Sequence, residues 1–218
     1  MMRNSLFIVI VCILFASCKE MTGKGTVFLV PPNSKTVQVK LIDTLGTVTL
    51  AVPDRYDTSF AWIDHSDCGK PCDLQKYRYQ PKSLRITKES GFIWLGEPED
   101  SVDRFTISHS GYFPFHNGDT SKDFVRHEHL KSQLTSDPSN PSIIFDTIER
   151  IHDRYYSIFA MQRSDTIRCE KVLAVTTVKG NLIRFQYDLL TKKVDSVETN
   201  FIKNSIDLIR TIQINRGI

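Results

Sequence analysis

Short segments in which apolar and polar residues alternate recur along most of this chain. Val37–Leu41 and Thr47–Val52 show the pattern most cleanly, and Asp43-Thr44-Leu45-Gly46 between them has the composition of a turn. Because successive side chains of a strand point to opposite faces, such segments predict strands with one buried face. The pair therefore predicts a β-hairpin, and the recurrence restricts the chain to folds rich in β structure.

Further strands are expected on both sides of one helical segment. The expected helix is Phe124–Leu134, which follows the capping sequence Thr120–Asp123 and ends before two prolines. The additional strands expected from alternation and turn residues are Phe60–Ile63, Lys76–Gln80, Leu84–Thr87, Phe92–Leu95, Val102–His109, Ile143–Ile151, Tyr155–Met161, Thr166–Val178 and Leu182–Tyr187.

Near the C-terminus, apolar and small residues recur at three- and four-residue steps, which predicts a second helix. These residues are Leu190, Val194, Val197, Phe201, Ser205 and Leu208, and Ile209–Ile214 is expected to form a last strand. Strands come in blocks instead of alternating with helices one by one, so the sheet should be mostly antiparallel. The predicted fold class is α+β, a mostly antiparallel sheet with a central and a C-terminal helix packed on it.

This order of elements resembles the PsbP-like fold, a sheet flanked by helices in small exported proteins. The resemblance covers residues 37–214 and includes the strand exit Leu50-Ala51-Val52-Pro53 and the closing Asn204-Ser205-Ile206. Members of that fold mostly bind or assemble, so the resemblance implies a binding protein and not a catalyst.

The N-terminus has the layout of a secretory signal. One cation, Arg3, precedes the apolar run Leu6–Phe15, which is shorter than the ~20 residues that a membrane-spanning helix needs. Phe15-Ala16-Ser17-Cys18 then resembles the lipobox of bacterial lipoproteins, although Phe15 stands where that motif usually has Leu. In that family the cysteine receives a diacylglycerol, the signal is cut in front of it and the new N-terminus is acylated, with chains such as palmitate.

The resemblance implies an organisation and a location. Residues 1–17 would be the signal peptide, 18–35 a tether rich in Gly and Pro, and 36–218 a single α+β domain. Several acyl chains on Cys18 would anchor the domain stably, since each buried methylene contributes about 0.8 kcal/mol. The expected partner is a membrane of the bacterial cell envelope, the outer one on its periplasmic or surface side, and another envelope protein is a second candidate. The alternatives are an uncleaved apolar anchor and an ordinary secreted protein.

Three further cysteines would then face an oxidising compartment. Cys68 and Cys72 flank Gly69-Lys70-Pro71, whose residues favour a tight turn, so a local disulfide is expected. Free thiols, or a redox or metal site, remain the alternatives. Cys169 is expected to be a buried, inert thiol.

No motif assigns a reaction, a cofactor or a metal. His127-Glu128-His129 falls on the expected helix, where residues two apart point about 200° from each other and cannot hold one ion, so a solvated helix face is expected. A net charge of +3 without a basic run argues against nucleic-acid binding. The sequence favours a non-catalytic binding or accessory lipoprotein over an immunity lipoprotein against a periplasmic toxin and over an envelope hydrolase.

Overall fold

The structure is a computed structural model that describes residues 29–42, 45–88, 101–110, 123–164, 167–192 and 200–215. Within these ranges the chain forms strands β1 (Ser34–Lys40), β2 (Thr47–Pro53), β3 (Thr58–Asp64), β4 (Leu74–Gln80), β5 (Val102–Ser110), β6 (Ser142–Ile151), β7 (Arg154–Ser164), β8 (Ile167–Val178), β9 (Asn181–Lys192) and β10 (Gln213–Asn215). The helices are α2 (Asp123–Ser136) and α3 (Phe201–Ile209).

The strands form two sheets, not the single sheet expected. A seven-stranded sheet has the order β3-β4-β5-β9-β8-β7-β6, and a three-stranded sheet has the order β1-β2-β10. Every pairing is antiparallel. Together with the two helices this confirms the α+β class with mostly antiparallel strands.

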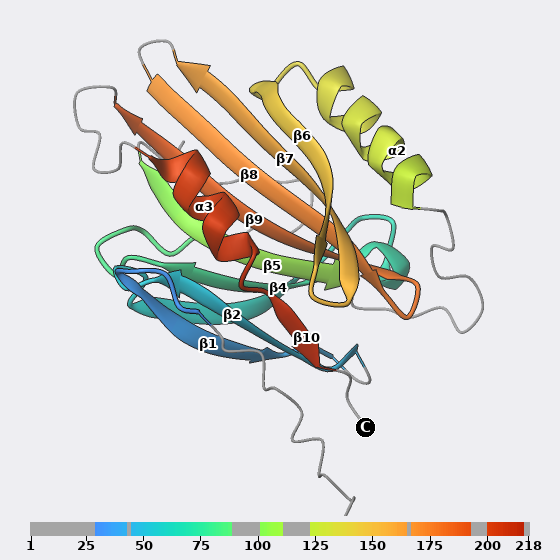
Figure 1. Ribbon diagram of the computed structural model, residues 1–218, viewed down its shortest axis with the longest axis horizontal. Helices are drawn as coiled ribbons and strands as arrows, with labels where there is room; N and C mark the ends of the chain where they lie inside the picture. The colour runs from blue at the N-terminus through green and yellow to red at the C-terminus, as the bar shows by residue number, and fades with distance from the viewer. Residues whose placement is uncertain are drawn as a thin grey trace, which may run out of the picture.

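The main core lies on one face of the large sheet. Phe105, Phe185 and Tyr187 point from this face and are fully buried, and the small sheet and α3 cover them (Figure 1). Thr211, which follows α3, accepts the backbone N–H of Ala51 of β2 on its Oγ1 atom at 2.8 Å. This contact joins the last part of the chain to the first hairpin.

Helix α2 covers the opposite face, beside β6 and β7 (Figure 1). Leu130 of α2 packs there against Phe159 and Met161 of β7. Ile158 and Ala160, which alternate with these two residues along β7, belong to the main core. Because neighbouring strand residues face opposite sides, the two helices pack on opposite faces of the large sheet.

Three expectations about the extent of strands and helices are wrong. Ile209–Ile214 is not one strand, because Ile209 is the last residue of α3 and β10 begins at Gln213. Leu84–Thr87 is not a strand, because the Gln80 side chain donates to the Leu84 and Arg85 carbonyls and holds the segment outside the ladder. Leu190 belongs to β9, where it pairs with Val102 and Cys169, and not to the last helix. The expected strand Phe92–Leu95, and Val194 and Val197 of the expected helix, lie outside the described residues.

Candidate functional site

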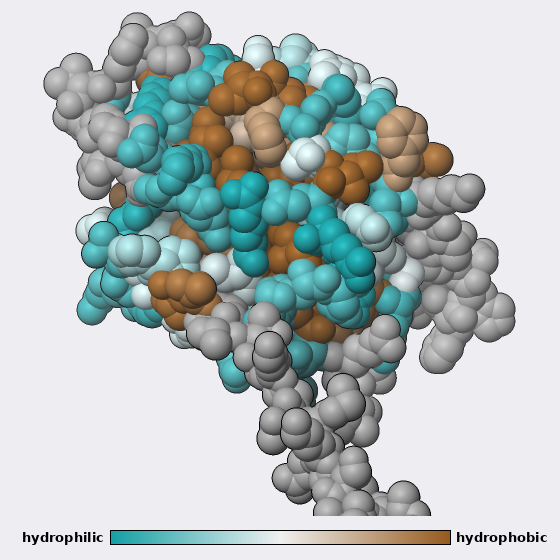
Figure 2. Space-filling view, in the orientation of Figure 1, coloured by the Kyte–Doolittle hydropathy of each residue, from teal (hydrophilic) through white to brown (hydrophobic). Residues whose placement is uncertain are grey.

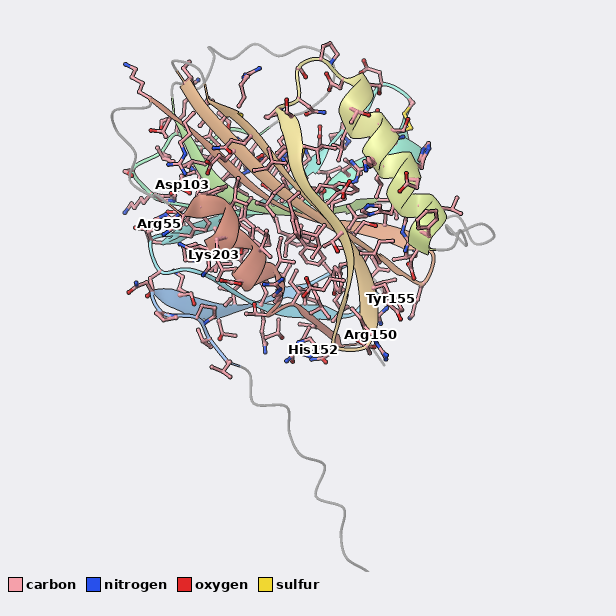
Figure 3. All side chains as sticks on the ribbon, turned by 45° about the horizontal axis from the view of Figure 1, so that its top comes forward. Arg55, Asp103, Arg150, His152, Tyr155 and Lys203 are labelled. Carbon is pink, nitrogen blue, oxygen red and sulfur yellow. A yellow bond between two sulfur atoms is a disulfide. The ribbon has the colours of Figure 1, made fainter. Side chains whose placement is uncertain are left out.

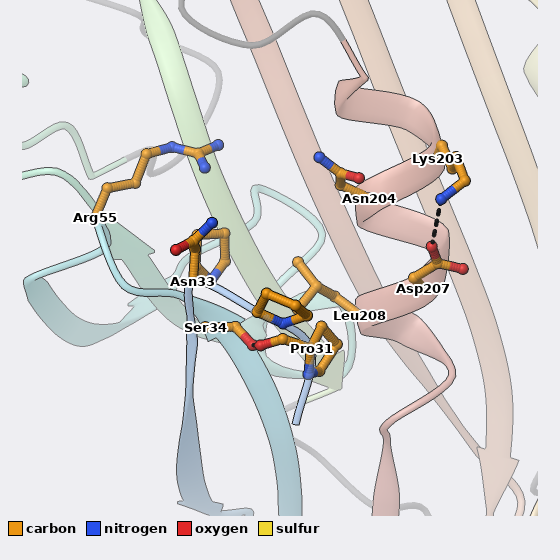
Figure 4. A pocket seen from close by; sticks show the side chains of 10 residues that line it. Pro31, Asn33, Ser34, Arg55, Lys203, Asn204, Asp207 and Leu208 are labelled. Carbon is orange, nitrogen blue, oxygen red and sulfur yellow. Dashed lines mark hydrogen bonds and ion pairs between the residues drawn. The ribbon is translucent and has the colours of Figure 1, made fainter. Parts of the chain in front are cut away.

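A pocket of about 390 Å³ opens where the chain enters the domain. The residues just before β1, the end of β2 and one side of α3 form its walls (Figure 4). Its lining residues are Pro31, Pro32, Asn33, Ser34, Pro53, Arg55, Lys203, Asn204, Asp207 and Leu208. We refer to it below as the entry pocket.

The wall before β1 is a fixed turn. Asn33 has a φ of 57°, in the left-handed region that Asn tolerates better than most residues. Its carbonyl accepts the N–H of Asp54 at 2.9 Å, and the hydroxyl of Ser34 donates to the Pro31 carbonyl. The turn is therefore attached to the end of β2, which holds the Asn33 side chain at the pocket.

A carboxylate from the large sheet holds Arg55 in place. The Nε and Nη2 atoms of Arg55 donate to Asp103 of β5 at 2.6 and 3.1 Å, and the Tyr56 hydroxyl donates to the same carboxylate at 2.6 Å. Burial, with the Asp103 charge second, raises the pKa of Tyr56 well above its ordinary value, so Tyr56 stays a donor. Figure 3 shows Arg55 beside Asp103, on the side of the molecule where Lys203 of α3 also lies.

The opposite wall is the exposed side of α3. Lys203 Nζ donates to Asp207 Oδ2 at 3.3 Å, and Asp207 also accepts from Arg210 at 3.1 Å. In Figure 4 the Asn204 amide and the Arg55 guanidinium point toward each other across the pocket, and the Asn33 amide points into the same space.

The entry pocket combines polar groups around its opening with an apolar floor. A guanidinium, two carboxamides and an ammonium–carboxylate pair surround the opening, while Pro31, Pro53 and Leu208 supply an apolar floor. A few convergent polar groups over an apolar surface are typical of sites for small ligands. The three polar residues that face one another, Asn33, Arg55 and Asn204, come from segments far apart in the chain, so no local motif could have revealed them. Only Asn204 belongs to a segment singled out in the sequence, the closing Asn204-Ser205-Ile206.

The residues predicted from the sequence lie elsewhere. Cys18 is outside the described residues. Cys68 and Cys72 are joined by a disulfide across the 3₁₀ turn η2 (Lys70–Cys72), with their Cα atoms 5.9 Å apart. Gly69 has a φ of 83°, and its carbonyl accepts the Cys72 N–H at 2.9 Å, so the Gly and Pro residues shape the turn as expected.

The carboxylate of Asp73 stabilises the start of this turn. It accepts the Ser66 N–H at 2.9 Å and contacts His65 Nδ1 at 3.0 Å. These two hydrogen bonds, the backbone one first, lower the pKa of Asp73. His65 therefore pairs with a carboxylate in this turn, which is a structural role.

Two other residues differ from expectation. Cys169 is a free thiol but only half-buried, because it lies on the face of the large sheet away from the main core. His127 is buried and stacks on Phe159 with ring centroids 4.6 Å apart, whereas His129 is exposed, so α2 does not present a solvated His-Glu-His face. The described ranges contain no group of three or more His, Cys, Asp or Glu side chains placed to hold a metal ion.

Within the described part of the chain, none of the helices has the length and apolar character needed to cross a bilayer. No protein-family model matches the chain, and no curated protein matches it in sequence. The solution structure of cyanobacterial PsbP (CyanoP) from Synechocystis sp. PCC 6803 is similar over 85% of this chain and 95% of that one, with 13% sequence identity and a TM-score of 0.47. This is a weak PsbP-like resemblance in fold alone.

Proposed function

We propose that this protein is a lipid-anchored, non-catalytic binding protein of the bacterial cell envelope, which holds a small polar ligand in the entry pocket. Acylation of Cys18 would anchor it, as the cation, the apolar run and the small residues before Cys18 imply. The ligand would carry both donor and acceptor groups, because amides, a guanidinium and a carboxylate line the pocket.

The observation that carries this proposal is the position of the pocket on the chain. Pro31 to Ser34, which form one wall, follow directly on the segment that would connect the domain to Cys18. The chain from Cys18 to Pro31, the first residue of the pocket, spans at most roughly 43–47 Å when fully extended. A domain anchored in this way keeps its entry pocket within that distance of the membrane, where a ligand in or near the bilayer can reach it.

Native mass spectrometry of the mature protein, extracted from the envelope into lipid nanodiscs, tests the proposal. The wild type should carry a bound small molecule in addition to its acyl chains. Asn204→Trp, which places a large ring over the opening from an exposed helix position, should lose that molecule. Ser132→Trp, an exposed site on α2, is the matched control and should keep it.

Two results contradict the proposal. One is a wild-type protein that retains no small molecule under conditions that preserve its fold. The other is a bound molecule that stays equally well in the Asn204→Trp variant, because it must then bind elsewhere.

A further inference from the structure

The large sheet has an open edge along β6. Among the described strands, β6 pairs with β7 alone. Within the described residues, the backbone groups of β6 are hydrogen-bonded only in the ladder with β7. The strand is ten residues long, from Ser142 to Ile151. The N–H and C=O groups of every second residue therefore face outward and are a template for another strand.

Most of this edge lacks protection against pairing. Strand β6 contains neither Pro nor Lys, and its register with β7 shifts near its start, between Ile143 and Phe145. From Phe145 to Ile151 the ladder is regular. Outer strands are normally blunted by Pro, Lys or bulges, because an uncovered apolar one pairs with other chains. Ile144 and Phe145 are exposed, and Figure 2 shows apolar surface in the upper half of the molecule, where Figure 1 places β6 and α2.

The charges of β6 fit a second copy of the same strand. Side chains alternate between the two faces, so in a two-fold antiparallel pair a residue faces itself or a residue an even number of positions away. When Ile148 faces its own copy, Asp146 faces Arg150 on both sides of the axis. Axes through Asp146, Glu149 or Arg150 would place like charges opposite each other, and an axis through Thr147 would pair no charges. Facing opposite charges stabilise a strand pair, so the axis at Ile148 is favoured.

Both partners of this pair are available. The guanidinium of Arg150 lies over the Tyr155 ring, 6.0 Å from its centroid, and within the described residues it has no carboxylate partner. Figure 3 shows both residues at the end of the β6–β7 hairpin. Asp146 pairs with Lys131 of α2 at 2.5 Å but stays partly exposed, so a second cation can reach it. A second copy would thus supply the carboxylate that Arg150 lacks.

The exposed apolar start of α2 lies beside the same edge. Lys131 reaches Asp146, so its side of α2 faces β6. Phe124 precedes Lys131 by seven residues and therefore lies on the same side of the helix, about 10.5 Å away along its axis. Because α2 and β6 run in opposite directions, Phe124 lies near the level of Ile148 (Figure 1). Phe124 is 65% exposed, and an axis at Ile148 would place the Phe124 rings of two copies on the same side of the joined sheet, near the axis.

We propose that two copies of this chain pair along β6 in antiparallel orientation, with a two-fold axis at Ile148, and join their large sheets into one. Backbone hydrogen bonds along Phe145–Ile151 and two Asp146–Arg150 pairs form the interface, and the Phe124 rings are covered beside it. The interface is distinct from the entry pocket and does not depend on the acylation of Cys18.

Disulfide cross-linking in cells that express the full chain tests this register. Facing residues of an antiparallel pair have Cα atoms about 4.5–5.5 Å apart, which suits a disulfide. Ile148→Cys faces its own copy, so oxidation with diamide should give at least tenfold more disulfide-linked dimer than the wild type, which keeps the free thiol of Cys169. Lys82→Cys, an exposed position after β4, is the matched control and should behave as the wild type.

A second pair of cysteines decides the register if Ile148→Cys does not fold. Thr147 faces Glu149 of the other copy when the axis lies at Ile148. Thr147→Cys and Glu149→Cys, co-expressed with different tags, should therefore cross-link to each other at least tenfold more than either does to itself. Self-linking of Thr147→Cys in preference overturns the proposed pairing, because the axis then lies at Thr147.

Charge variants in the Ile148→Cys background test the Asp146–Arg150 pairs. Arg150→Asp places two carboxylates opposite each other on each side of the axis and should lower the dimer yield at least fivefold. Arg150→Lys and the control Lys82→Asp should keep the yield within twofold.

Four results overturn the proposal. They are no dimer from folded Ile148→Cys, an equal yield from Lys82→Cys, an unchanged yield in Arg150→Asp, and a cross-link of Ile148→Cys to a different protein, which would then occupy the edge of β6.

Discussion

His127 of α2 stacks its imidazole on the Phe159 ring of β7, with the two planes inclined by only 16°. The pair forms the buried centre of the contact between α2 and the large sheet. Within the described residues, His127 Nδ1 is buried without a hydrogen-bond partner. Burial is the largest influence on this imidazole and lowers its pKa, against the raising effect of the Asp146 and Glu128 carboxylates; Lys131 also lowers it.

Acid should therefore weaken the fold through His127. The folded-state pKa lies below the unfolded value of about 6.5, so between the two values the unfolded chain binds more protons. The stability that neutral His127 contributes is complete above about pH 6.5 and is lost as the pH falls toward the folded-state pKa. Urea denaturation between pH 7.5 and 5 should show this loss, and it should be smaller in His127→Leu. The exposed His129→Leu should behave as the wild type; an identical pH dependence in His127→Leu would count against the account.

The Asp103 carboxylate should be a larger contributor to stability than the exposed ion pairs. It lies largely buried under Arg55 and Tyr56. Asp103→Asn removes the negative charge and replaces one of the two acceptor oxygens by an NH2 group, which cannot accept from either donor. We expect a cost of about 1–3 kcal/mol in the free energy of unfolding. Lys131→Gln breaks the more exposed pair with Asp146, which solvent screens, and should therefore destabilise the fold less than Asp103→Asn does. Equal costs by urea denaturation would mean that Asp103 does not organise this side of the entry pocket.

The C-terminal helix should be a core element. Phe201 is 1% exposed, whereas the Lys203 side chain on the same helix is 78% exposed. Phe201→Ala should cost about 3–5 kcal/mol, because it removes a large side chain from a packed site. Lys203→Ala should change stability by about 0.5 kcal/mol or less. Small and similar effects in urea denaturation would show that α3 is not held by the core.

The disulfide between Cys68 and Cys72 should be a local brace. Thiol alkylation of the native protein without reductant should leave both cysteines unmodified, and modification of both in the folded protein would disprove the bridge. The bond closes a loop of only a few residues, so its reduction should lower the free energy of unfolding by at most about 2 kcal/mol. We expect the reduced protein to remain folded, with a slightly lower midpoint of urea denaturation.

The sequence predicted best what depends on neighbouring residues. The hairpin of β1 and β2 follows from two alternating segments and a short turn, and both strands lie within three residues of the predicted bounds. Leu190 was misassigned because the apolar spacing at the end of β9 happens to continue the helical stripe of Phe201, Ser205 and Leu208. Periodicity alone cannot separate the two when a long strand precedes a helix.

Features built from distant segments could not be predicted. The small sheet gains its third strand when β10 pairs with β2, in which Ile214 lies opposite Val48. No local pattern encodes such a pairing, because it is selected by the burial of both strands over the main core. The entry pocket has the same origin, since Asn33, Arg55 and Asn204 meet only after these sheets and α3 have packed together.

Acylation of Cys18 is the central claim, and metabolic labelling with a clickable fatty-acid analogue tests it most directly. The wild-type chain should incorporate the label and fractionate with membranes. Cys18→Ser should incorporate none, and should either keep its signal peptide or appear in the soluble fraction. A wild-type protein that is expressed and exported but takes up no label would contradict the account.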